Sequence, residues 1–212
     1  MVHESSSRHR ASFLRALLVA ALFALPAASA VAAPETFEID REHTAITFKV
    51  RHLFSKVPGR FTDFSGTLWL DRANYAASRV EVTIQAASVD TDQDQRDNHL
   101  RSDAFFDVAN HPTLTFKSTA VRPQGDKKLA IDGDLTIRGV TKRVTLDVDI
   151  LGSATYYNVE RVGFEARVTI DRTEFGVSWN DAVEGGGYVL GHEVEITLNV
   201  EAKKKDQPAS AK

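Results

Sequence analysis

The chain has 212 residues, of which 42% are apolar and 26% charged, with only 6 Pro. This composition is typical of a soluble globular protein and excludes disorder, collagen and coiled coil for most of the chain. The formal net charge of −3 argues against a protein that grips nucleic acid. The sequence contains no Cys, which excludes disulfides, thiolate metal sites and cysteine nucleophiles.

Residues 1–32 have the pattern of a secretory signal peptide. Arg8 and Arg10 precede an apolar run that ends at Leu25, and a stretch of small residues follows. The run is short for a membrane span, which needs about 20 residues. We therefore expect cleavage after Ala30 or Ala32 and export to the periplasm.

From Glu35 onward, apolar and polar residues alternate with a period of two, which predicts half-buried β-strands. Strands with one apolar face are typical of an antiparallel sheet, and closing the sheet into a barrel removes its exposed edges. The turn signals between them are Pro58-Gly59, Asp71–Asn74, Gln124–Asp126 and Arg138-Gly139. The eight predicted strands are Ile46–Val50, Phe64–Leu70, Val80–Ile84, Leu114–Phe116, Leu129–Ile137, Val144–Ile150, Phe164–Ile170 and Val194–Val200.

Two segments depart from the alternation. The segment from about Asp92 to Phe106 is polar and predicts a short helix, with Thr91 or Asp92 as its N-cap. Residues 203–212 are rich in Lys and poor in apolar residues, which predicts a disordered tail.

No local motif predicts a metal, a cofactor or a catalytic centre. His192-Glu193 begins like a zinc-protease helix, but Ile196 stands where the second histidine is required. The five histidines after residue 33 do not pair at a metal-binding spacing along the chain. We therefore expect no metal and no cofactor.

Several runs of the sequence resemble, in order, the YceI-like family of secreted lipid-binding proteins. Together they extend over about residues 36–202, and one departure is Arg138, where the family often has His. The matching runs are Ile39–Leu53, Gly59–Phe61, Phe64–Thr67, Ser88–Thr91, Arg96–Ser102, Phe105–Val108, Pro112–Ser118, Gly133–Lys142 and Asp171–Val177.

The resemblance implies an all-β fold, an eight-stranded antiparallel lipocalin-like barrel with one short helix over residues 35–202. It also implies non-catalytic binding, storage or transport of a polyisoprenoid or similar long-chain amphiphile, including quinone-like molecules. Residue periodicity points Phe48, Phe64 and Phe116 inward but leaves open whether the barrel is solid or hollow. With the resemblance, the predicted pocket residues are Phe48, Val50, Phe64, Leu68, Phe105, Phe116, Leu135, Val168 and Phe175.

The head group of such a ligand should decide which lipid binds. A lipid tail leaves an equally apolar bilayer, so its burial contributes little net free energy, whereas polar contacts at the mouth discriminate. The predicted mouth residues are Arg51, His52, Arg96, Asn98, His99 and Trp179.

Two other functions compete with lipid carriage. One is an enzyme of isoprenoid or stress metabolism, with His52 or His99 and Asp97 as an acid and base pair. The other is an interaction module with a solid barrel. The expected partner is a long-chain isoprenoid lipid and not nucleic acid, while transient membrane contact and a homodimer stay open.

Overall fold

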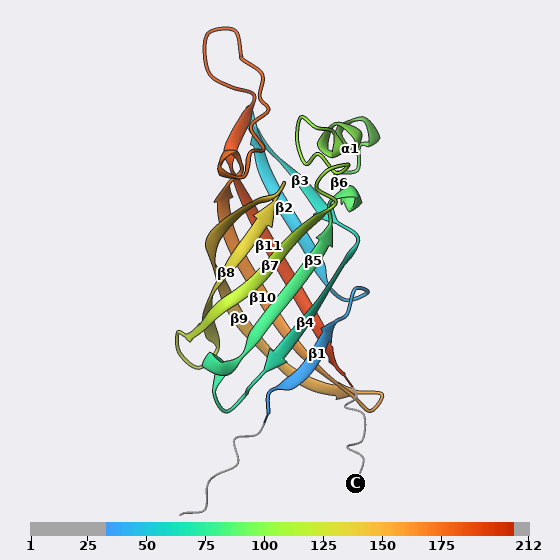
Figure 1. The fold of residues 1–212 in the computed structure, drawn as a ribbon, viewed down its shortest axis with the longest axis vertical. Coiled ribbons are helices and arrows are strands. Elements are labelled where there is room, and N and C mark those ends of the chain that lie inside the picture. Colours follow the sequence, from blue (N-terminus) through green and yellow to red (C-terminus); the bar gives the residue numbers. More distant parts are fainter. Residues whose placement is uncertain (1–32, 206–212) are drawn as a thin grey trace, which may run out of the picture. The chain divides into compact units, whose positions relative to one another are not determined.

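The computed structural model describes residues 33–205, and all eight apolar runs predicted as strands form strands there (Figure 1). In chain order the strands are β1 (Glu35–Ile39), β2 (Ala45–His52), β3 (Ser55–Phe61), β4 (Phe64–Leu70), β5 (Arg79–Gln85), β6 (Val89–Asp90), β7 (Thr113–Pro123), β8 (Lys128–Ile137), β9 (Val140–Tyr156), β10 (Val159–Asp171) and β11 (Leu190–Lys204). One α-helix, α1 (Asp94–Arg101), and three 3-10 turns, Tyr75–Ala77, Ala86–Ser88 and Arg172–Phe175, complete the structure.

The sheet closes on itself as an antiparallel barrel. β1 pairs with β4 on one side and with β11 on the other, so that Phe37 lies between Leu68 and Lys204. β1 and β2 follow each other along the same side of β11, so they form one interrupted strand. In the same way, β3 and β4 form a second interrupted strand, and β5 and β6 form a third. Counting each interrupted pair as one strand gives an eight-stranded barrel, as the sequence predicts.

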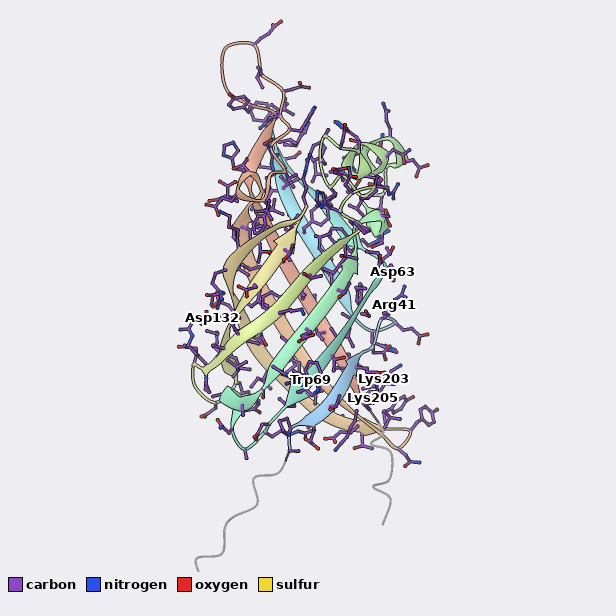
Figure 2. The ribbon with its side chains drawn as sticks, in the orientation of Figure 1. Arg41, Asp63, Trp69, Asp132, Lys203 and Lys205 are labelled. Carbon is purple, nitrogen blue, oxygen red and sulfur yellow. The ribbon has the colours of Figure 1, made fainter. Side chains whose placement is uncertain are left out.

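The breaks between β1 and β2 and between β3 and β4 lie next to each other. Arg41 in the first break forms an ion pair with Asp63 in the second, with 3.2 Å between Nη1 and Oδ1, and Figure 2 shows both at this edge of the barrel. Arg41 also donates to the carbonyl oxygen of Thr62 at 3.2 Å. These contacts therefore fix the β1–β2 break and the β3–β4 break relative to each other.

The turn predicted at Pro58-Gly59 is wrong, because both residues lie inside β3. Lys49 of β2 faces Pro58, and Phe48 faces Gly59. β3 pairs with β6 only at Arg60 and Phe61, so Pro58 has no strand on its other edge and its missing N–H costs no ladder hydrogen bond.

The predicted helix exists but is shorter than expected. Gln93, not Thr91 or Asp92, is its N-cap, and its side chain accepts a hydrogen bond from the Arg96 N–H. Asp92 instead adopts a left-handed conformation with φ of 59°. The chain beyond Arg101 continues as turns up to β7.

The C-terminal boundary also differs from the prediction. Lys203 and Lys204 belong to β11, and the Lys205 N–H donates to the carbonyl oxygen of Thr36 at 2.8 Å. Carboxylates hold all three lysines, with Asp40 binding Lys203, Glu35 and Glu160 binding Lys204, and Glu38 binding Lys205. Figure 2 shows Lys203 and Lys205 beside β1.

Two predictions lie wholly or largely outside the described residues. These are the signal peptide over residues 1–32 and the part of the tail from residue 206 onward. Within residues 33–205, no helix combines the length and apolar character needed to cross a membrane.

Candidate binding cavity

A cavity of about 650 Å³ lies inside the barrel. Every strand except the two-residue β6 contributes side chains to its wall, and nearly all of them are apolar. The volume is in the range of pockets that bind small molecules, about 300–1,000 Å³. The barrel is therefore hollow, and the solid-core alternative does not describe this structure.

Eight of the nine predicted pocket residues line this cavity, and their contact with a ligand stays a prediction. They are Phe48, Val50, Leu68, Phe105, Phe116, Leu135, Val168 and Phe175.

Phe64 is the exception. It is buried, with 4% of its surface exposed, but lines a separate smaller hollow with Glu38, Arg41 and Trp69. Phe61 and Leu68 both line the cavity although they are an odd number of residues apart, so the inward phase shifts at the break between β3 and β4. Phe64 is the first residue after that break, where the alternation does not fix its surroundings.

Two glycines in the cavity wall leave space for aromatic rings that pack against their backbone. A methyl group on Gly59 would lie 2.3 Å from Cζ of Phe48, and one on Gly133 would lie 2.3 Å from Cζ of Phe116. Glycine in a strand often marks such a close approach. Both rings therefore lie against the wall and leave the interior open.

At the α1 end, an aromatic cluster forms part of the cavity wall. His99 meets Trp179 and Phe105 edge to face, with ring centroids 4.8 and 4.9 Å apart. Nη1 of Arg138 donates to the carbonyl oxygen of Phe105 at 2.7 Å, which joins the β8–β9 hairpin to this cluster. His52 and Arg96 also line the cavity here, so four of the six predicted mouth residues gather at this end.

The other two predicted mouth residues, Arg51 and Asn98, are exposed and do not line the cavity. Nη1 of Arg51 donates to the carbonyl oxygen of Phe54 at 3.4 Å, and the Asn98 side chain accepts from Arg101 at 3.1 Å. Their direct contact with a head group inside the cavity is therefore not supported by the geometry.

The acid and base pair required by the enzyme hypothesis is not assembled. Asp97 is buried and accepts hydrogen bonds from the backbone N–H of Thr91 at 2.9 Å and from its hydroxyl. Among the hydrogen bonds of residues 33–205, none joins Asp97 to His52 or His99. Asp97 fixes the start of α1 in this arrangement.

Sequence reasoning missed a buried charged residue of the cavity wall, Arg172. It is only 6% exposed. A signal was present, because Phe164, Ala166, Val168 and Ile170 face inward along β10 and Arg172 is the next residue in that phase. A charged residue that continues an inward apolar phase indicates a polar group inside a barrel.

One group of described residues could geometrically surround a cation, namely Asp40, Glu42 and His43. The Asp40 carboxylate, however, already binds Arg161 at 2.7 Å and Lys203 at 2.8 Å. A metal ion would have to displace both cations, so the group is described better as an ion-pair network at the opposite end of the barrel.

Comparison with known proteins identifies the relatives of this chain. Residues 37–202 match the model of the YceI-like domain family. The chain is 42% identical over 180 residues to Protein YceI of Escherichia coli O157:H7, covering 82% of this chain and 89% of that protein. It is 40% identical over 178 residues to Protein YceI of Salmonella arizonae, covering 82% and 88%.

Solved structures share the fold. The crystal structure of BcnA from Burkholderia cenocepacia has a TM-score of 0.67 and 25% identity, covering 77% of this chain and 98% of that chain. The YCEI protein of Campylobacter jejuni has a TM-score of 0.63 and 32% identity, covering 74% and 90%. A polyisoprenoid binding domain from Saccharophagus degradans has a TM-score of 0.60 at 14% identity, covering 80% and 98%.

Proposed function

The chain belongs to the YceI-like family, and from this membership and the hollow barrel we propose that it binds, stores or carries one long-chain lipid without transforming it. The observation that carries the proposal is the cavity of about 650 Å³ with an almost wholly apolar wall. Such a wall favours a slender apolar chain and excludes most polar metabolites, whose desolvation it could not offset.

The class of lipid that we propose is a polyisoprenoid or a similar amphiphile, which includes quinone-like molecules. The domain from Saccharophagus degradans is described as polyisoprenoid binding, and its fold is shared. Side chains from strands all around the barrel line a single cavity, which fits one linear tail along the barrel. The polar mouth at α1 suits the head of the same molecule.

We propose the periplasm as its location. The support is the N-terminal sequence pattern of basic residues, a short apolar run and small residues over positions 1–32.

Lipid binding is tested by organic extraction of the purified protein followed by mass spectrometry. We expect a long-chain lipid to co-purify, because replacing it by water would leave the apolar wall hydrated. Incubation with that lipid should leave its mass unchanged, whereas turnover would favour the enzyme hypothesis. An empty extract, together with failure to take up added prenyl lipids, would overturn the proposal.

We further propose that the β2–β3 hairpin touches the bilayer when lipid is exchanged. Phe54 at its tip is 96% exposed, and Tyr188 in the loop before β11 is 66% exposed. The two segments are joined by the N–H of Leu53, which donates to the carbonyl oxygen of Val189 at 2.9 Å. Val189 and His52 line the cavity, so these exposed apolar groups border its mouth, where they can insert among lipids.

Replacing Phe54 and Tyr188 by Ser should slow lipid transfer to phosphatidylcholine vesicles about tenfold, because less apolar surface would enter the bilayer. The matched control is Tyr157→Ser. Tyr157 is 83% exposed but lies in the β9–β10 turn, at the other end of β10 from the loop that carries Tyr188. Equal transfer rates for the double variant and the wild type would contradict membrane contact at this hairpin.

A further inference from the structure

Arg172 is an unusual residue for the wall of an apolar cavity. It follows the last residue of β10 and is only 6% exposed. Of the described residues that line the cavity, only Thr91 and Arg172 are buried and polar or charged. The hydroxyl of Thr91 is already used by Asp97 and Arg96.

Backbone carbonyl groups hold the Arg172 guanidinium in place. Its Nε donates to Gly191 at 2.9 Å, and its Nη1 donates to Val177 at 2.6 Å and to Trp179 at 3.0 Å. Its Nη2 is buried without a hydrogen-bond partner. Over residues 33–205 the other such side-chain atom is Nε of Arg161, and Arg161 does not line the cavity.

The positive charge of Arg172 is also without a bound carboxylate. The neighbouring Asp171 accepts hydrogen bonds from the backbone N–H and the hydroxyl of Thr173, at 2.8 and 2.6 Å. Burial lowers the pKa of Arg172, and the charge of Asp171 opposes that shift only in part. A buried cation that keeps a free donor is stabilised by any ligand that brings an anionic oxygen to it.

We propose that Arg172 is the head-group anchor of the cavity and that it selects long-chain amphiphiles with a singly charged oxygen head, a carboxylate above all. This inference rests on the proposed lipid-binding function and adds its head-group chemistry. Only Nη2 remains free to donate, which suits one carboxylate better than a multiply charged diphosphate. Trp179, whose carbonyl oxygen binds Arg172, contacts His99, so the head lies at the α1 end and the tail extends along the barrel.

Three probes with one prenyl chain and different heads test the assignment. These are geranylgeranoic acid, its methyl ester and geranylgeraniol, each titrated into delipidated wild-type protein. We expect the acid to bind about tenfold more tightly than either neutral probe, the usual gain of a hydrogen bond to a charged group. Equal binding of all three would overturn the role of Arg172 while leaving lipid binding intact, and binding of none would contradict lipid binding itself. Tighter binding of geranylgeranyl phosphate than of the acid would overturn the single-charge head.

Arg172→Gln should reduce the preference for the acid to within about twofold by removing the charge and the Nη2 donor. Arg172→Lys keeps the charge and should keep part of the preference. The control Arg167→Gln changes the same residue type on β10, but on the exposed outer face, where it pairs with Asp149 and Glu165. If Arg172→Gln does not fold, the three probes on the wild type still decide. An unchanged preference in folded Arg172→Gln would refute the proposal.

Discussion

Asp40→Asn is expected to lower the free energy of unfolding by about 3 kcal/mol, the usual cost of breaking a buried ion pair. Asp40 is 4% exposed, and its carboxylate accepts from Arg161 at 2.7 Å and from His43 and Lys203, each at 2.8 Å. These three partners come from β10, from the break between β1 and β2, and from β11. The amide would leave Arg161 and Lys203 without their shared charge partner. Urea denaturation of the two proteins measures the difference.

The same network predicts the acid sensitivity of the barrel. Burial alone raises the pKa of Asp40, but hydrogen bonds from Lys203, Arg161 and His43 outweigh it and hold the pKa well below its usual range. A depressed carboxyl pKa contributes stability above the pKa of the unfolded chain, about 3.9, and that contribution is lost as pH falls toward the folded value. The stability gap between wild type and Asp40→Asn should therefore narrow below about pH 4.

Asp132→Asn is the matched control for this substitution. Asp132 pairs with Arg122 through two hydrogen bonds of 2.9 and 2.7 Å, but on the outer face of the barrel, where solvent screens the charges. We expect a much smaller loss of stability there. Equal losses for the two variants, or a gap for Asp40→Asn that stays constant down to pH 2, would contradict the buried network.

Sequence periodicity predicted the barrel because its signal is local and repeated. In β8 to β11 the apolar phase recurs along most of each strand, and most of those residues line the cavity as expected. β1 and β3 were missed because β1 carries only Phe37 and Ile39 on its inward phase, and because Pro58-Gly59 in β3 has the composition of a turn. The role of Gly59 in the strand becomes clear only from the structure, which shows the Phe48 ring packed against it.

The alternation of apolar and polar residues predicted which side chains of a regular strand face the cavity. It did not predict features of the site that depend on tertiary contacts. Phe48 and Phe116 line the cavity, whereas Phe64 does not, because a phase shift at a strand break has no signature in the alternation. Arg172 has no carboxylate partner because the Asp171 side chain accepts hydrogen bonds from Thr173 and not from Arg172. No sequence pattern specifies that choice, since Asp171 and Arg172 are neighbours and could equally be read as an ion pair.

Ala166→Phe is expected to block long ligands without damaging the fold. Ala166 lies in the middle part of β10, is 6% exposed and is paired with Val148 and Leu198, and all three residues line the cavity. The added ring would occupy space inside the barrel instead of packed core, so the unliganded protein should keep or gain stability. Affinity for a prenyl acid with an eight-isoprene tail, about twice the length of geranylgeranoic acid, should fall by about a hundredfold, since each methylene left in water forgoes about 0.8 kcal/mol.

A short-chain probe separates blockage from disruption. With the head at Arg172, a tail that runs along β10 meets Ala166 after six residues of strand, which is about 20 Å at the usual rise. Geranic acid ends before that point and should bind the variant as well as it binds the wild type. Ala120→Phe places the same ring on the exposed face of β7 and should alter neither affinity. If Ala166→Phe weakens both acids equally while remaining folded, the tail does not pass Ala166 and the proposed direction of the ligand in the barrel is wrong.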